Sequence, residues 1–257
     1  MKKQLFVLAL CTLGLTAMAQ GVNMDNSIEN AFSFGSGVSD AGLVAYYTFN
    51  GDASDRSGNG NNGTVNRAMV TDGYNGEASG AYAFGGPHSP GSIRVPKSES
   101  LRIGNEWTFA AYVKPLGVTA MDGYGNNSST GAQTIMAKSH DRSGFVIMYN
   151  LNGDKFNTWM GGFASWTKGI NANMPGSYLS QWVHVAYVYS NGEFRIYLNG
   201  ELKSTKQVTP DFSRANNEDM YLGKFSDYWY PMNGALDEVR IYNRALDGLE
   251  IQTLSRM

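Results

Sequence analysis

The chain has 257 residues, a length that fits one large all-β domain. It contains 31 glycines and only 16% charged residues, so it is rich in turns and is not a coiled coil. The formal net charge of −2 provides no basic field that could neutralise a row of phosphates, which argues against a nucleic-acid partner. The single cysteine, Cys11, excludes an internal disulfide framework and a zinc site built on cysteines.

Residues 1–19 predict a cleaved export signal. Lys2 and Lys3 supply the positive charge, and residues 5–15 form an apolar run too short to span a bilayer. The triplet Ala17-Met18-Ala19 fits the cleavage site. The protein is therefore expected outside the cytoplasm, in the periplasm, at the cell surface or in the medium.

A lipoprotein is the alternative, with Cys11 as the lipid-attachment residue, although Leu10 is bulky for the position before it. Residues 20–41 are polar and predict a flexible N-terminal arm. The folded domain is expected over residues 42–257, where no segment is long enough for a transmembrane helix.

After the arm, short β-branched and aromatic runs alternate with turn residues, as in an antiparallel sandwich. The run 107–114 alternates with period two and has one face fit for a core. The clearest hairpin joins 182–189 to 193–198 through Asn191-Gly192, and a second Asn-Gly pair, Asn199-Gly200, extends it into a meander.

Further along, residues 144–150 are apolar on both faces and predict a central strand, and residues 235–242 predict another strand. Asp247 and Glu250 predict the capping box of a short C-terminal helix. Binding usually resides in long loops, which are expected at 116–132, 161–180 and 208–219.

Five segments carry a family pattern: GLVAYYTFNGDASDRSGNGNNGTV from Gly42, AYAFGG from Ala81, WTFAAYVKP from Trp107, QWVHVAYVYSNGEFRIYLNGEL from Gln181 and NGALDEVRIYNRALDGLEI from Asn233. In this order they resemble bacterial LamG-like jelly-roll domains of the concanavalin A-like lectin/glucanase superfamily. The resemblance implies an all-β, two-sheet antiparallel sandwich that binds carbohydrate or protein, often with a bound Ca²⁺. It does not identify the ligand.

The densest cluster of oxygen-bearing side chains and glycines is residues 55–63. Ca²⁺ takes six to eight oxygen ligands, and the family brings this loop near the Asp-Glu-Val strand. The resemblance therefore implies one structural Ca²⁺ held by Asn50, Asp55, Asn61 and Asp237. The family often has Asp in place of Asn50, and the lost charge weakens the site. The alternative is a metal-free turn cluster selected for positive φ.

Sugar recognition needs an aromatic platform beside amides or charges. Trp107 and Trp182 begin core strands and are assigned to packing, whereas other aromatic residues lie beside loops with polar neighbours such as Asn157. The predicted carbohydrate-binding residues are Trp159, Trp166, Tyr228, Trp229, Asp141 and Arg142. The alternative is that the aromatic members seal the sheet and the Asp-Arg pair forms a solvated turn.

Glycoside hydrolases share the superfamily, but retaining hydrolysis needs two carboxylates roughly 5 Å apart, and the E-x-D-x-x-E strand motif is absent. In a regular strand the adjacent Asp237 and Glu238 point to opposite faces. His184 is expected to be packed and hydrogen-bonded. The leading hypothesis is thus an exported, non-catalytic lectin-like module for a glycan or glycosylated surface. A protein-adhesion module is the alternative, and a glycoside hydrolase is third.

Overall fold

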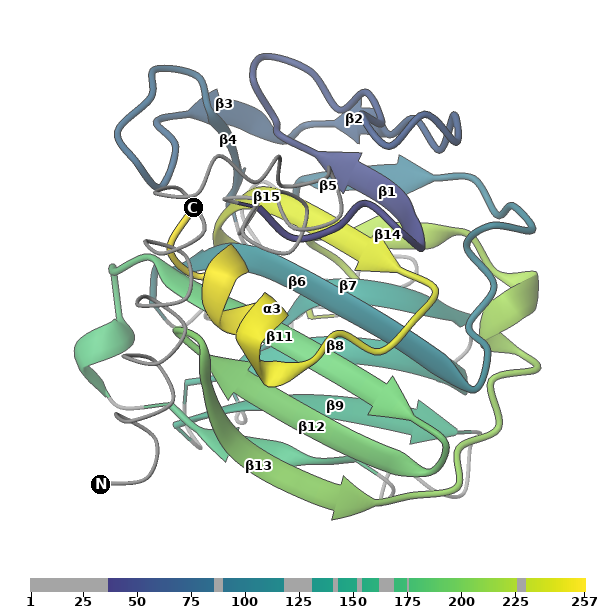
Figure 1. Ribbon diagram of the computed structural model, residues 1–257. Coiled ribbons are helices and arrows are strands. Elements are labelled where there is room, and N and C mark those ends of the chain that lie inside the picture. The colour runs from purple at the N-terminus through teal and green to yellow at the C-terminus, as the bar shows by residue number, and fades with distance from the viewer. Residues whose placement is uncertain are drawn as a thin grey trace, which may run out of the picture. The chain divides into compact units, whose positions relative to one another are not determined.

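The computed structural model confirms a sandwich of two antiparallel sheets with one short C-terminal helix (Figure 1). The structure divides into two units, Met1–Val38 and Ser39–Met257, and every element below belongs to the second. The described residues are 37–85, 90–117, 131–140, 143–151, 154–161, 169–174, 176–225 and 230–257. Within these ranges no helix has the length and apolar composition needed to cross a bilayer. The predicted export signal lies outside them.

Sheet A contains eight strands among the described residues. The last strand of the chain, β15 (Asn233–Tyr242), lies inside this sheet and pairs with three neighbours, namely β6 (Glu106–Pro115), β4 (Ala81–Gly85) and β1 (Leu43–Tyr47). Beyond β4 the sheet ends at β3 (Met69–Thr71). On the other side of β6 it continues through β11 (Val183–Ser190), β12 (Glu193–Leu198) and β13 (Glu201–Gln207).

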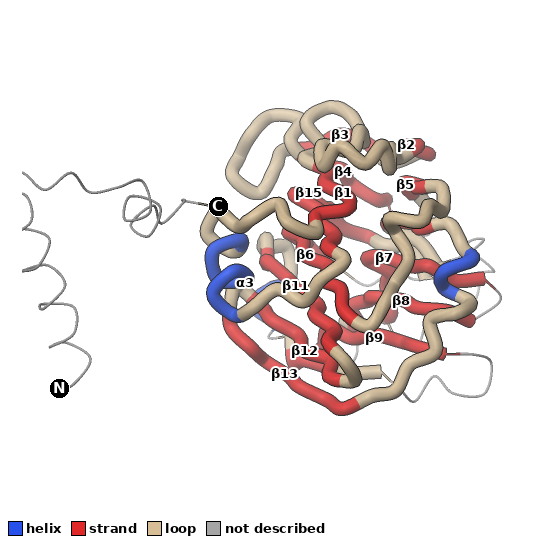
Figure 2. Tube along the Cα trace, turned by 45° about the vertical axis from the view of Figure 1, so that its right-hand side comes forward, coloured by secondary structure: helices blue, strands red, loops and turns tan. Residues whose placement is uncertain are grey.

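Sheet B contains seven described strands. From one edge to the other they are β10 (Asn171–Asn173), β9 (Lys155–Gly161), β8 (Ser143–Asn150), β7 (Ala132–His140), β14 (Met220–Leu222), β5 (Ser92–Val95) and β2 (Thr64–Asn66). Two short 3-10 helices, η3 (Gly176–Tyr178) and η4 (Ala215–Asn217), lie in connections. The helix α3 (Gly248–Leu254) lies over the outer face of sheet A (Figures 1 and 2).

The core between the sheets follows the predicted alternation. In β6 the buried core residues are Trp107, Phe109, Ala111 and Val113. The Trp107 ring meets the rings of Phe145 and Phe194 edge-on, with centroids 4.9 and 5.4 Å apart. All residues from 144 to 149 are buried, and β8 lies between β7 and β9, as expected for a central strand. Trp107 is therefore a packing residue.

The local turn and cap signals are confirmed as well. Asn191 and Gly192 have φ of 45° and 99°, as a type I′ hairpin turn requires. The Asp247 side chain accepts hydrogen bonds from the backbone N–H groups of Leu249 and Glu250, and the Glu250 side chain accepts one from the Asp247 N–H. This capping box starts α3 at the predicted residue.

Strand β15 differs from the prediction because it contains a bulge. Its register to β6 shifts between Asp237 and Arg240, and Glu238 has φ of 51°. The bulge lets β15 change its neighbour: Leu236 pairs with β4, whereas Val239 pairs with β1. The expectation that Asp237 and Glu238 point to opposite faces assumed a regular strand, so it does not apply here.

Candidate functional site

The predicted carbohydrate-binding residues belong to sheet B or to its connections. Trp159 lies in β9, where its backbone pairs with Val146 of β8, but its side chain lies outside the described residues. The other five positions also lie outside them: Trp166 between β9 and β10, Tyr228 and Trp229 between β14 and β15, and Asp141 and Arg142 between β7 and β8. Chain connectivity thus attaches four of the six to sheet B, whereas Tyr228 and Trp229 follow β14 of sheet B and precede β15 of sheet A.

The outer face of sheet B carries a second apolar cluster, distinct from the main core. Its buried members are Ala132, Ala137, Val146, Met148 and Phe225, with Tyr230 packed against them. Directly opposed residues of neighbouring strands share a face of the sheet. Met148 of β8 therefore forms one cross-strand row with Thr134 of β7 and Asn157 of β9.

Two polar atoms in this row lack a hydrogen-bond partner. Thr134 Oγ1 and Asn157 Oδ1 are unpaired, although the residues are only 0% and 3% exposed. An unpaired buried polar atom costs about 1–3 kcal/mol, so native proteins contain few of them. The two residues flank Met148 and are two strands apart, which corresponds to about 10 Å. The row thus presents two hydrogen-bonding groups on either side of an apolar side chain.

The predicted metal ligand Asp55 holds the loop between β1 and β2 together. Its Oδ1 accepts hydrogen bonds from the backbone N–H groups of Tyr46 and Ser57, at 3.0 and 2.8 Å. Its Oδ2 accepts from the Ser57 hydroxyl and from the Asn61 N–H, both at 2.9 Å. A carboxylate has about four lone-pair positions, and here the protein itself occupies all of them.

Asn61 is also fully engaged. Its Oδ1 accepts from the Ser98 hydroxyl at 2.6 Å, and its Nδ2 donates to the Val44 carbonyl and to Ser100 Oγ, at 2.7 and 2.9 Å. The structure therefore brings Asn61 and Asp55 together, but through a hydrogen bond. All three side-chain oxygens that could ligate Ca²⁺ from this pair already accept protein hydrogen bonds.

The other two predicted metal ligands do not join them. Asn50 is exposed, and Asp237 accepts the Tyr74 N–H at 2.9 Å and the Glu238 N–H at 2.7 Å instead. Burial raises the pKa of Asp237 to about 6, against the opposing effect of these two hydrogen bonds. Within the described ranges no group of three or more Asp, Glu, His or Cys side chains could hold a metal ion. As arranged, these residues fit a hydrogen-bonded loop and not a Ca²⁺ cage, and the ion stays a prediction.

The bulge of β15 organises a polar cluster on sheet A. Arg240 pairs with Glu238 at 2.6 Å and lies over the Tyr46 ring at 4.1 Å. The Tyr46 hydroxyl donates to Glu238 at 2.7 Å. His184 is buried beside Tyr112, as expected, but its Nδ1 has no hydrogen-bond partner. Burial lowers the pKa of His184 to about 3, so the ring is neutral and suits packing.

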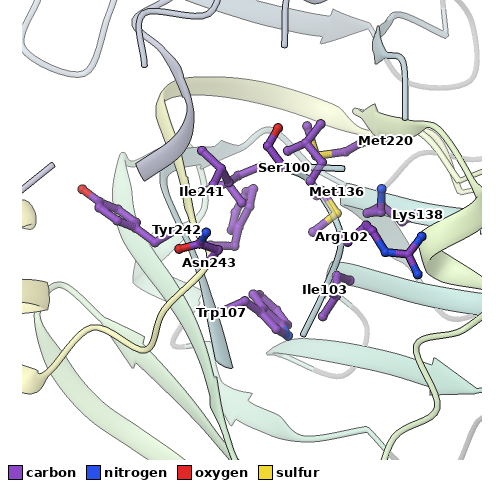
Figure 3. A pocket seen from close by; sticks show the side chains of 13 residues that line it. Ser100, Arg102, Ile103, Trp107, Met136, Lys138, Met220, Ile241, Tyr242 and Asn243 are labelled. Atoms are coloured by element: carbon purple, nitrogen blue, oxygen red, sulfur yellow. The ribbon is translucent and has the colours of Figure 1, made fainter. Parts of the chain in front are cut away.

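A small cavity of about 20 Å³ lies at one end of the core, room for one water molecule (Figure 3). Leu101, Trp107 and Met136 give it an apolar lining, and Lys138 also lines it. The Lys138 ammonium is buried and donates to the Glu218 carbonyl at 3.1 Å. Burial lowers the pKa of Lys138 to about 8. Lys138 carries no local sequence signal of its burial, because an alternating strand position alone does not mark a buried lysine.

Among solved structures, the chain is similar to domain 4 of AbnA, a GH43 extracellular arabinanase from Geobacillus stearothermophilus, in complex with arabinotriose. The two are 26% identical, with 84% of this chain and 100% of that chain covered and a TM-score of 0.62. The binding domain of Paraclostridial Mosquitocidal Protein 1 is 19% identical, with 83% and 52% covered and a TM-score of 0.62.

The binding domain of botulinum neurotoxin DC, in complex with rat synaptotagmin II, is 15% identical, with 85% and 52% covered and a TM-score of 0.63. At these lower identities the two toxin domains show a common fold, and this chain spans about half of their length. No curated protein sequence matches the chain. A family model described as the concanavalin A-like lectin/glucanases superfamily matches residues 87–252. The resemblance is therefore confirmed, and the chain belongs to the concanavalin A-like lectin/glucanase superfamily.

Proposed function

We propose that this protein is an exported, non-catalytic module that binds a glycan on the outer face of sheet B. The observation that carries the proposal is the row of Thr134, Met148 and Asn157, with its two unpaired polar atoms. The similarity to the arabinanase domain supports a carbohydrate ligand, because the match covers that domain completely and its structure was solved in complex with arabinotriose. A shared fold does not transfer the particular sugar.

The row matches the chemistry of a sugar ring, which has apolar C–H faces and hydroxyl groups at its edge. Because Met148 is fully buried, a sugar hydroxyl meets the row first at Asn157 Oδ1, with Thr134 Oγ1 on the far side of Met148. The row continues from Asn157 to Asn171 of β10, whose side chain is exposed. The ligand can therefore enter from the β10 edge, where the row reaches solvent.

The non-catalytic part of the proposal rests on how the adjacent carboxylates are used. Asp237 accepts two backbone N–H groups, and Glu238 binds Arg240 and the Tyr46 hydroxyl. Groups held in this way support the bulge and are poorly placed to exchange protons with a substrate. Export is proposed on the N-terminal sequence alone.

A glycan array followed by calorimetric titration tests the proposal. We expect saturable binding of arabinose-containing or related neutral oligosaccharides, and at least about a tenfold loss in affinity for Asn157→Ala. Asn157 Oδ1 has no hydrogen-bond partner, so this variant removes no protein hydrogen bond from that atom and should keep its fold. Trp166→Ala and Trp229→Ala test the predicted platforms in the same assay.

Asn105→Ala is the matched control, because Asn105 is an exposed asparagine before β6 of sheet A. It should bind sugar as the wild type does. If no glycan binds and a protein partner is captured instead, the adhesion alternative replaces the proposal. Release of reducing sugar from a polysaccharide would overturn the non-catalytic role.

A further inference from the structure

A polar hollow of about 390 Å³ lies between the β5–β6 connection and η4, the short helix beside β7 and β8 in Figure 2. Its volume is within the range of small-molecule sites. Every lining residue is polar or charged: Lys97, Ser98, Glu99, Arg102, Asn216 and Asn217. Such a lining suits a hydroxylated ligand, and none of these residues belongs to the row on sheet B.

The walls of the hollow are held by hydrogen bonds of the protein itself. Asn216 Oδ1 accepts the Ile103 N–H at 2.6 Å, and Asn216 Nδ2 donates to the Ile103 carbonyl at 2.9 Å. On the other side, Asp219 accepts the Lys97 N–H at 2.8 Å and pairs with Arg94 at 2.6 Å. Because the walls are already ordered, binding a ligand would cost little conformational entropy in them.

Positive charge exceeds negative charge around this hollow. The Lys97 ammonium makes only a long hydrogen bond, of 3.3 Å, to the Asn217 carbonyl. Arg102 lies 3.7 Å from the carboxylate of Glu99, whose side chain is 91% exposed, and such an exposed pair contributes little. Behind the wall, burial lowers the pKa of Lys138, the carboxylates of Asp219 and Glu218 oppose this effect, and the charge of Arg102 adds to it. The lining itself thus holds two cations, Lys97 and Arg102, and one exposed carboxylate, that of Glu99.

We propose that this hollow is a second binding site, which takes a carboxylate-bearing saccharide such as a uronate. The ligand carboxylate replaces Glu99 as the partner of Arg102 and approaches Lys97, because a guanidinium binds a carboxylate through two parallel hydrogen bonds. The ligand hydroxyls meet the polar lining, including the Asn217 side chain. This site does not depend on the glycan site proposed on sheet B.

Calorimetric titration of the purified protein with trigalacturonate tests the proposal, with the neutral galactose trisaccharide and inorganic phosphate as comparison probes. We expect trigalacturonate to bind and both comparison probes to bind at least about tenfold more weakly. Affinity should fall as salt rises, since salt screens exposed charges.

Two exposed substitutions should act in opposite directions, which a folding defect would not produce. Arg102→Gln should weaken trigalacturonate binding by about tenfold, and Glu99→Gln should strengthen it, because the competing carboxylate is gone. Arg56→Gln is the matched control, because Arg56 also lies in an exposed ion pair, with Asp52. Equal affinity for the neutral trisaccharide or for phosphate, or no effect of Arg102→Gln, would overturn the proposal. Asn157→Ala should leave this binding unchanged, which separates the two sites.

Discussion

Replacing Asp55 with alanine tests whether hydrogen bonds or a metal ion hold the β1–β2 loop. The variant removes the acceptor of three backbone N–H groups, those of Tyr46, Ser57 and Asn61. A hydrogen bond contributes about 1 kcal/mol net, and somewhat more when one partner is charged. These donors are partly buried, so water replaces the carboxylate incompletely. We therefore expect the free energy of unfolding to fall by about 3 kcal/mol.

Urea denaturation in EDTA and in millimolar Ca²⁺ provides the assay. The midpoint should fall by the same amount in both buffers, with an unchanged m value. Asp52→Ala is the control in the same loop. Asp52 pairs with Arg56 and accepts the Ser54 N–H at 2.8 Å, but its side chain is 51% exposed and water can replace it, so its loss should cost less than about 1 kcal/mol.

A loss below about 1 kcal/mol for Asp55→Ala in EDTA would refute the hydrogen-bond interpretation. If Ca²⁺ stabilises the wild type by mass action and Asp55→Ala abolishes this stabilisation, Asp55 is a metal ligand.

Two further predictions concern sheet A and its contact with the β14–β15 turn. Burial raises the pKa of Asp237 to about 6, so the folded state favours the protonated carboxyl. The contribution of this proton to the free energy of unfolding is fully present below the unfolded pKa of about 4 and is lost as the pH rises through 6. From pH 4 to pH 7 the wild type should lose roughly 2 kcal/mol relative to Asp237→Asn in urea denaturation, and parallel pH curves would contradict this. In Gly223→Ala the new Cβ would lie 2.1 Å from the buried Phe84 ring, so the melting temperature should fall sharply. Gly58→Ala has a similar φ of 85° but open space, and equal losses in both variants would rule out the steric explanation.

The features that sequence reasoning predicted correctly are those set by neighbours in the chain. The Asn191-Gly192 turn and the Asp247 cap depend on a few adjacent residues, so their signals can be read directly. The bulge at Glu238 could not be predicted in this way, because it depends on an exchange of neighbouring strands between β4 and β1.

The same distinction applies to the candidate sites. Residues 144–150 could be recognised as a central strand, but the pairing of Met148 with Thr134 and Asn157 is a matter of register between strands. Asp55 had a local signal: its carboxylate accepts the N–H of Ser57, two residues on, as in the Asx turns that aspartate favours. Such a turn indicates a loop organiser as readily as a metal ligand.

The position of β15 has a consequence for how the protein is made. β15 is synthesised after all the other described strands, and it supplies a neighbour of both β1 and β4, two of the first of them to emerge. Until β15 has been synthesised, β1 lacks its sheet partner and β4 can pair only with β3, and pairing over such separations is intrinsically slow. Sheet A therefore cannot be completed before β15 has been synthesised. A fragment that stops before Asn233 would expose unpaired strand edges and become a target for proteases.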